Sequence, residues 1–185
     1  MTSLSNFESQ LKKDNINQIQ ICYIDYCGRL CGKIIPISQI ESVISKGVVF
    51  AKANLSFGLD DHFAEGAIFL ANTGDFLANP DFNSYTFLKH RLGIARFFSN
   101  MLDESGNNWS GCPRSQLQKT LNKYDELEIK VKISLEPEFS IYKKNENEFD
   151  PFSFDGMFTI SGMDKIFPVW QDLYESFQRS NINIE

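Results

Sequence analysis

The first half of this 185-residue chain is organised around the stretch IQICYIDYCGRLCGKII, Ile19 to Ile35. Its two ends, Ile19–Tyr26 and Leu30–Ile35, are rich in β-branched, aliphatic and aromatic residues, and Cys27-Gly28-Arg29 between them has the composition of a turn. Two such runs joined by a short turn pair most simply with each other. The stretch therefore predicts a β-hairpin.

The segments on either side of this hairpin predict two helices and two further strands. Ser38 with Glu41 three residues on forms a capping box, which stabilises a helix start by about 1 kcal/mol, and Gly47 is suited to end that helix. The expected elements are helices at Asn6–Lys13 and Ser38–Gly47, and strands at Phe69–Leu77 (interrupted at Thr73-Gly74-Asp75) and Leu92–Leu102. Together they predict an α+β fold, a small and mostly antiparallel sheet with a helix across it.

A second domain is expected to begin near Gly111-Cys112-Pro113, because Pro113 suits the first position of a helix. Its predicted elements are a helix from Pro113 with Leu117, Leu121 and Tyr124 facing a core, an alternating strand at Lys130–Tyr142, a charged turn at Lys143–Glu148, a helix at Asp164–Arg179 and the start of a strand at Asn181–Glu185. We expect domains at residues 1–108 and 109–185, the second incomplete.

The composition is that of a globular protein, with 42% hydrophobic residues, a formal net charge of −6 and a pI near 5.0. No run of Lys or Arg is present, so nucleic acid is not an expected partner. The N-terminus lacks the apolar core of a signal peptide, and no eighteen apolar residues run together, so no membrane span is expected. We expect a cytoplasmic protein.

Familiar site motifs are absent from the sequence. The four cysteines include no C-x-x-C pair and the two histidines stand far from them, so neither a zinc site nor a disulfide framework is expected. Gly28-Arg-Leu-Cys-Gly32-Lys33 invites comparison with a phosphate-binding loop, but only three residues separate the glycines and Ile34 follows the lysine. A hairpin turn explains this run better. The usual dinucleotide-binding and serine-hydrolase motifs do not occur.

Two carboxylates in the alternating run KVKISLEPEFSIY are candidates for metal binding. Glu136 and Glu138 fall on one face of the predicted strand, about 7 Å apart, where they would repel by about 2 kcal/mol at an effective dielectric of about 20. One interpretation is a solvated polar face whose charge is balanced by Lys130 and Lys132. The other is a site for a hard cation such as Mg²⁺, which prefers carboxylate oxygens.

Several short motifs in order along the chain resemble the N-terminal part of the glutamine synthetase family, and its divergent glutamine synthetase-like branch more than the housekeeping enzyme. These motifs are Asp25-Tyr-Cys-Gly28-Arg-Leu-Cys-Gly32-Lys33, Thr73-Gly74-Asp75, Asn79-Pro80-Asp81, Cys112-Pro113-Arg114 and Leu135-Glu136-Pro137-Glu138-Phe139. The resemblance implies a β-grasp N-terminal domain followed by the truncated start of the catalytic domain. It also implies that Glu136 and Glu138 bind the family's paired divalent ions, Mg²⁺ or Mn²⁺.

The activity implied by this resemblance is ATP-dependent ligation, in which the γ-carboxylate of glutamate or a related acid is phosphorylated and ammonia or an amine displaces the phosphate of the γ-glutamyl phosphate intermediate. In this family the remaining metal ligands and the nucleotide site would lie beyond Glu185, so the chain alone is not expected to be active. The full-length protein is expected to be a homo-oligomer. Glu136 and Glu138 would anchor ions and would not act as general bases.

One departure from the family pattern concerns the acceptor. Family members that use ammonia carry an F-D-G-S-S loop, and the corresponding run here is Phe50-Ala51-Lys52-Ala53-Asn54. Because Ala51 replaces the aspartate, a larger amine becomes a plausible acceptor. An alternative from another functional class is a non-catalytic β-grasp module that binds a protein partner through an exposed sheet edge.

Overall fold

The computed structural model describes residues 4–88, 91–144, 149–152, 154–156, 158–180 and 182–184. The chain divides into two compact units, Met1–Lys130 and Val131–Glu185. Within the described residues no helix is long and apolar enough to cross a membrane.

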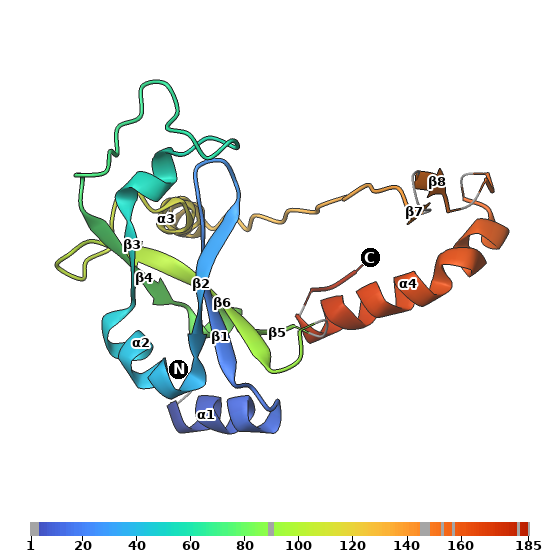
Figure 1. The fold of residues 1–185 in the computed structure, drawn as a ribbon, viewed down its shortest axis with the longest axis horizontal. Helices are drawn as coiled ribbons and strands as arrows, with labels where there is room; N and C mark the ends of the chain where they lie inside the picture. Colours follow the sequence, from blue (N-terminus) through green and yellow to red (C-terminus); the bar gives the residue numbers. More distant parts are fainter. Residues whose placement is uncertain are drawn as a thin grey trace. The chain divides into compact units, whose positions relative to one another are not determined.

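The first unit is a mixed α/β fold built on one curled sheet (Figure 1). Its strands are β1 (Gln18–Ile24), β2 (Leu30–Pro36), β3 (Val48–Ala51), β4 (Asp75–Pro80), β5 (Thr86–Phe87) and β6 (Ile94–Leu102). The order across the sheet is β2-β1-β6-β4-β3, and β5 pairs with β6. β1 and β6 run parallel at the centre, whereas the other pairs are antiparallel. The α+β prediction is confirmed at this level.

The predicted hairpin is confirmed as β1 and β2, paired from Gln18↔Pro36 to Ile24↔Leu30. Gly28 lies in the turn with a φ of 77°, a conformation that glycine adopts at little cost. Its N–H donates to the Asp25 carbonyl at 3.1 Å, and the Asp25 N–H donates to the Arg29 carbonyl at 3.1 Å. The glycine run therefore closes a turn.

The core lies on one face of this sheet. β6 alternates strictly, with Ala95, Phe97, Ser99 and Met101 buried. Aromatic rings fill the centre: Phe76 is fully buried and packs against Tyr23 at 5.1 Å and against Phe50 at 5.6 Å between ring centroids. Buried residues of helices α1 (Leu4–Lys13) and α2 (Ile40–Lys46) join the same cluster. The period-two pattern of β6 thus fixes which face meets the helices.

Helix α2 forms where expected, but it begins differently. A 3₁₀ turn, η1 (Ile37–Gln39), precedes it, and neither Pro36 nor Gln39 at the two helix starts makes a side-chain capping bond. The predicted capping box of Ser38 and Glu41 is wrong, because Ser38 lies inside the 3₁₀ turn and not at the start of the helix. Gly47 ends the helix with a φ of 70°, as predicted.

The strand predicted at Phe69–Leu77 is largely wrong, since β4 starts only at Asp75. The preceding residues form a local turn, in which the Leu70 N–H donates to Thr73 Oγ1 at 2.7 Å and the Thr73 N–H donates to the Leu70 carbonyl at 2.9 Å. Two further 3₁₀ turns, η2 (Lys52–Ser56) and η3 (Phe82–Ser84), connect the strands. The hydrogen bond between the Thr73 side chain and the backbone competes here with the pairing of this segment as a β-strand.

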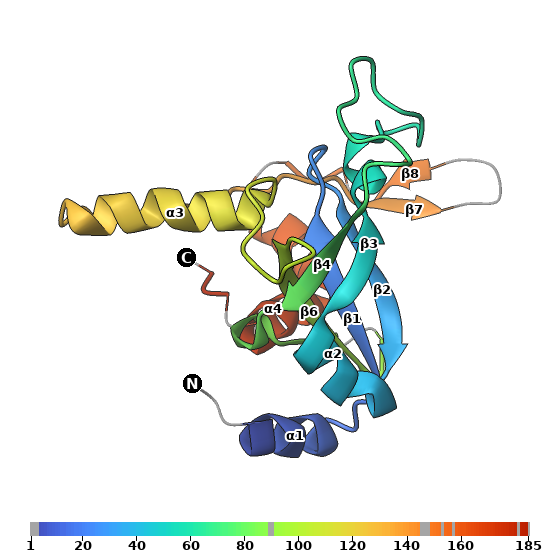
Figure 2. The same ribbon diagram turned by 90° about the vertical axis from the view of Figure 1, so that its left-hand side faces the viewer.

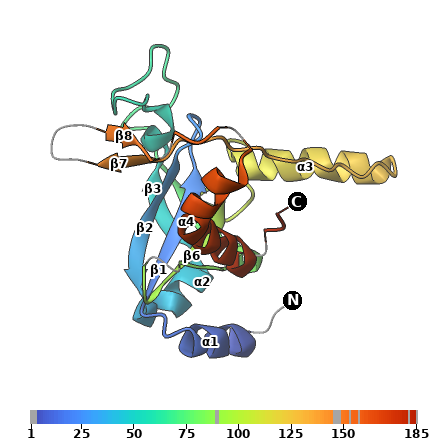
Figure 3. The ribbon, with the colours of Figure 1, turned by 90° about the vertical axis from the view of Figure 1, so that its right-hand side faces the viewer.

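Helix α3 (Pro113–Glu126) starts at Pro113 as predicted, but its expected core-facing stripe is wrong. Leu117 is 57% exposed and Tyr124 is 42% exposed, because the helix projects away from the sheet (Figures 2 and 3).

The residues just before α3 do not mark a break in packing. Trp109 stacks on Phe76 at 6.0 Å and Cys112 is fully buried, so the boundary predicted after residue 108 stays a prediction and the compact unit runs on to Lys130.

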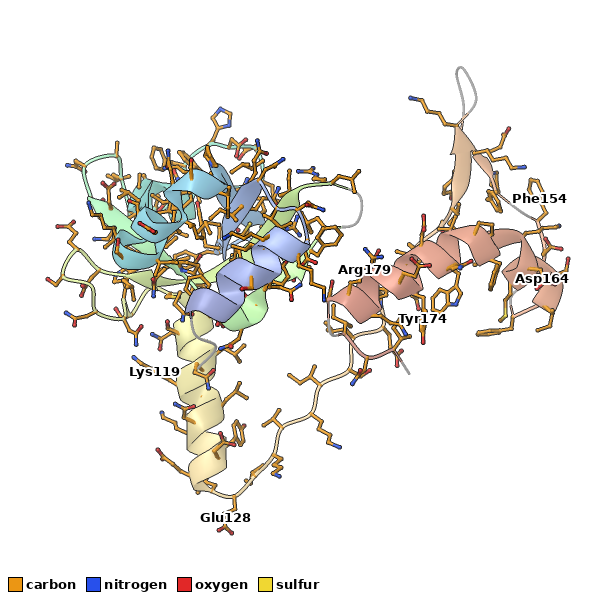
Figure 4. All side chains as sticks on the ribbon, turned by 90° about the horizontal axis from the view of Figure 1, so that it is seen from below. Lys119, Glu128, Phe154, Asp164, Tyr174 and Arg179 are labelled. Carbon is orange, nitrogen blue, oxygen red and sulfur yellow. The ribbon has the colours of Figure 1, made fainter. Side chains whose placement is uncertain are left out.

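The second unit contains β7 (Tyr142–Lys144), β8 (Phe149–Pro151) and α4 (Ile160–Arg179). The strand predicted at Lys130–Tyr142 is wrong, since residues 129–141 form neither helix nor strand. Figure 4 shows the chain after Glu128 extended, and residues 129–140 are exposed. Helix α4 starts four residues earlier than predicted and buries none of its described side chains. Residues 182–184 are not a strand, and positions 145–148, 181 and 185 lie outside the described residues.

Candidate functional site

Glu136 and Glu138, the predicted metal ligands, are both exposed and lie in the extended segment between α3 and β7. Residues that alternation predicted to be buried are exposed as well, with Leu135 at 86% and Phe139 at 63%. A half-buried strand needs a neighbouring strand for its backbone groups, and the described residues provide none here. Within the described part of the chain no group of three or more metal-ligating side chains assembles. The metal role of the pair stays a prediction.

The hairpin motif brings a buried carboxylate and an arginine together. The Asp25 side chain is 1% exposed, and its Oδ1 accepts from the N–H groups of Cys27 at 2.9 Å and Arg29 at 2.8 Å. Arg29 Nε donates to Asp25 Oδ2 at 2.7 Å. Burial acts to raise the pKa of Asp25, but the hydrogen bonds and charge of Arg29 hold that pKa below its ordinary value. The carboxylate is therefore charged and serves to lock the turn.

Arg29 also ties the hairpin to the loop that follows η2. Its Nη1 lies 3.0 Å from Asp61 Oδ1, and its Nη2 donates to the Phe57 carbonyl at 3.4 Å. The loop is closed by a bridge between Phe57 and Phe63, whose rings lie 4.8 Å apart. The structure assigns the Asp61 carboxylate to Arg29.

Ala51, where the resemblance leads us to expect the family's aspartate, is the last residue of β3 and pairs with Asp75. It is partly buried and is followed by Lys52, whose Nζ lies 4.0 Å from Glu104 Oε1 and 5.6 Å from the centre of the Trp109 ring. The residue after Ala51 is therefore a lysine whose ammonium group lies near Glu104 and Trp109.

A polar cluster joins two of the quoted motifs at the base of α3. Arg114 Nη2 lies 2.6 Å from Asp81 Oδ2, and Arg114 Nη1 donates to Asn100 Oδ1 at 2.9 Å. Arg114 and its two partners border an open pocket of about 460 Å³, which is lined mainly by polar side chains of β6 and α3. Both charged partners are partly exposed, so this pair contributes at most about 1 kcal/mol.

Sequence reasoning named Asp81 and Arg114 but did not pair them, and it missed Asn100. The alternation of β6 was the available signal, since it places Asn100 on the opposite face from buried Ser99 and Met101. Nothing in the sequence indicated which residue this amide would meet. The cluster is therefore built by the sheet and α3 together.

No family model matches the chain. Among curated proteins it is similar to a glutamine synthetase of Pyrococcus horikoshii, with 27% identity over 163 residues, 86% of this chain and 34% of that protein. A glutamine synthetase of Halobacterium salinarum is 26% identical over 74% of this chain and 29% of its own length. Type-1 glutamine synthetase 2 of Dictyostelium discoideum is 27% identical over 83% and 31%. The chain thus spans about a third of the length of these relatives.

Solved structures agree on the fold. GmaS without ligand superposes with a TM-score of 0.69 at 15% identity, over 96% of this chain and 39% of that one. A novel glutamine synthase homolog gives 0.65 at 18% identity, over 90% and 39%. At these identities the match carries the fold alone. Sequence and fold together confirm the resemblance expected from the motifs: the chain is similar to the glutamine synthetases, and its coverage fits the N-terminal portion of such a protein.

Proposed function

We propose that the chain is part of a glutamine synthetase-like, ATP-dependent carboxylate–amine ligase that works through a γ-glutamyl phosphate. The observation that supports this most is the coverage, because relatives named glutamine synthetase match 74–86% of this chain along only about 30% of their own length. A GmaS structure is a complex with ADP, which agrees with nucleotide chemistry in this fold. Activity, substrates and oligomeric state belong to the whole protein and are proposed for it.

Within this proposal Glu136 and Glu138 bind the paired Mg²⁺ or Mn²⁺ ions. Two carboxylates on one short segment suit a hard cation chemically, but two ligands are too few to hold an ion that prefers six oxygens. Because both side chains are exposed, ions bound to them could take further ligands from elsewhere in a longer protein. When bound, the ions would neutralise phosphate charge during phosphoryl transfer. The glutamates would hold the ions and would not act as general bases.

We also propose that the acceptor is an amine larger than ammonia. Ala51 supplies no carboxylate at the position of the family aspartate. A neutral or apolar amine substituent would find more room at Ala51 than at an aspartate.

The finer fold and the setting of the protein are part of the same proposal. The hairpin, the helix after it and the parallel pair of β1 and β6 support a β-grasp domain. The protein would be a cytoplasmic homo-oligomer. Chain 1–185 by itself would be inactive.

The test uses a longer protein from the same reading frame. ATP-dependent phosphate release is measured with glutamate and a series of amines for the wild type, Glu136→Gln, Glu138→Gln and the control Glu128→Gln, an exposed glutamate outside the motif. Loss of turnover in the two motif variants, with unchanged thermal unfolding and a fully active control, is expected because the change removes the charge and keeps the volume. Wild-type turnover in both variants would contradict the metal assignment. Absence of nucleotide-dependent activity with glutamate and every amine in the series would favour the interaction module.

A further inference from the structure

A second pocket, of about 300 Å³, lies on the first unit and is lined by residues of β1, β2 and β6 and by Arg91. These three strands neighbour one another in the sheet (Figure 1). We name this pocket the outer-face hollow, because Gln20 and Cys22 line it and point to the opposite face from the buried core residues Ile19 and Ile21. It contains none of the proposed metal or acceptor residues.

The charged side chains in the described lining of this hollow are all cationic. Its described lining includes Lys33, Arg91 and Arg96 and no Asp or Glu, in a chain whose formal net charge is −6. Lys33 is already engaged, since its Nζ donates to the Val49 carbonyl at 2.7 Å and lies 4.6 Å above the Phe50 ring. The two guanidinium groups therefore dominate the hollow.

The Arg96 side chain is held by a hydrogen bond, and the backbone of Arg91 is held by the turn that carries it. Arg96 belongs to the central strand β6, and its Nε donates to Oε1 of the buried Gln20 at 3.0 Å. Among the described residues, its two terminal nitrogens make no hydrogen bond. Arg91 lies in the turn before β6, where its N–H donates to the Leu88 carbonyl at 2.9 Å and its carbonyl accepts from Ile94 at 3.2 Å. Guanidinium groups bind phosphate in a bidentate manner, and the held group of Arg96 would lose little freedom on binding.

The remaining lining is apolar or neutral. Leu30 and Ile34 on β2 are 43% and 52% exposed and stand at the rim. Burial raises the pKa of the Cys22 thiol despite the opposing charge of Arg96, so this sulfur is protonated and is a neutral part of the wall. The hollow thus combines a cationic end with an apolar side.

We propose that the outer-face hollow binds a phosphate monoester, with the phosphate dianion on Arg91 and Arg96 and the organic part of the ligand against Leu30 and Ile34. A dianion is favoured over a carboxylate because two cations face one ligand. The site is separate from the proposed ligase chemistry, so it can be tested on chain 1–185.

The test is titration of chain 1–185 with inorganic phosphate, phenyl phosphate and benzoate at low ionic strength, followed by amide chemical shifts. We expect phenyl phosphate to bind best, with shifts centred on β2 and residues 91–96. Arg96→Gln and Arg91→Gln should each weaken phosphate binding by about tenfold, since each removes charge-assisted hydrogen bonds. Ile34→Ser should remove the preference for phenyl phosphate over phosphate and leave phosphate binding unchanged.

The matched control is Lys46→Gln, an exposed cation at the end of α2 outside the hollow. An equal loss of binding in this control, or unchanged binding in both arginine variants, would overturn the proposal. Tighter binding of benzoate than of phenyl phosphate would overturn the assignment to phosphate. If Arg96→Gln does not fold, Arg91→Gln on the exposed turn decides the outcome alone.

Discussion

Replacing Gly32 by alanine tests whether the hairpin depends on close contact between β1 and β2. Gly32 pairs with Cys22, and a Cβ at this position would lie 2.4 Å from the Ile21 carbonyl oxygen and 3.1 Å from Cys22 Sγ. The first distance is far inside van der Waals contact, and the oxygen belongs to a buried central strand that cannot move alone. Forced overpacking of this kind costs about 1–3 kcal/mol. We expect Gly32→Ala to lower Tm by roughly 4–8 °C for a cost near 2 kcal/mol.

Gly28 in the same hairpin provides the matched comparison. A Cβ there would meet nothing within 4 Å, but φ is 77°. Gly28→Ala should therefore cost about 1–2 kcal/mol through backbone strain, and Gly28→Asn less, because asparagine tolerates this conformation. At Gly32 the order should reverse, since Asn adds atoms to a crowded position. Urea unfolding of the four variants decides this, and the reasoning fails if Gly32→Ala changes stability by under 0.5 kcal/mol or if Asn is better than Ala at position 32.

Three further outcomes are expected. Asp25→Asn should destabilise the chain at pH 7, and the difference in unfolding free energy from wild type should shrink by pH 3. The pKa of Asp25 is lowered in the folded state, so the charged carboxylate stabilises the fold above the unfolded pKa near 3.8, and this stabilisation is lost as pH falls through the folded pKa. Urea unfolding midpoints at both pH values will report the difference. Phe76→Ala should cost about 3–5 kcal/mol by emptying the centre of the aromatic cluster; a cost below 1 kcal/mol in calorimetry would contradict the core assignment. Chain 1–185 should bind Mn²⁺ no more tightly than about 1 mM by calorimetry, because Glu136 and Glu138 supply too few ligands.

Local features of the fold could be predicted from the sequence because their signals lie within a few residues. The turn at Gly28 and the end of α2 at Gly47 depend on the backbone freedom of glycine, and the start of α3 at Pro113 depends on the fixed φ of proline. The alternation of β6 likewise determined its buried face. Motifs in family order also pointed to the relatives that the comparisons found.

Tertiary structure decided everything that needs a partner from far along the chain. The pairs Arg29–Asp61 and Asp81–Arg114 join residues 32 and 33 positions apart, and no local pattern encodes which carboxylate an arginine will meet. The alternating run around Glu136 and Glu138 carries a clear strand pattern and yet forms no strand among the described residues. Periodicity determines which side chains share a face, whereas pairing requires a second strand within hydrogen-bonding distance to satisfy the backbone, and only the assembled chain can supply it.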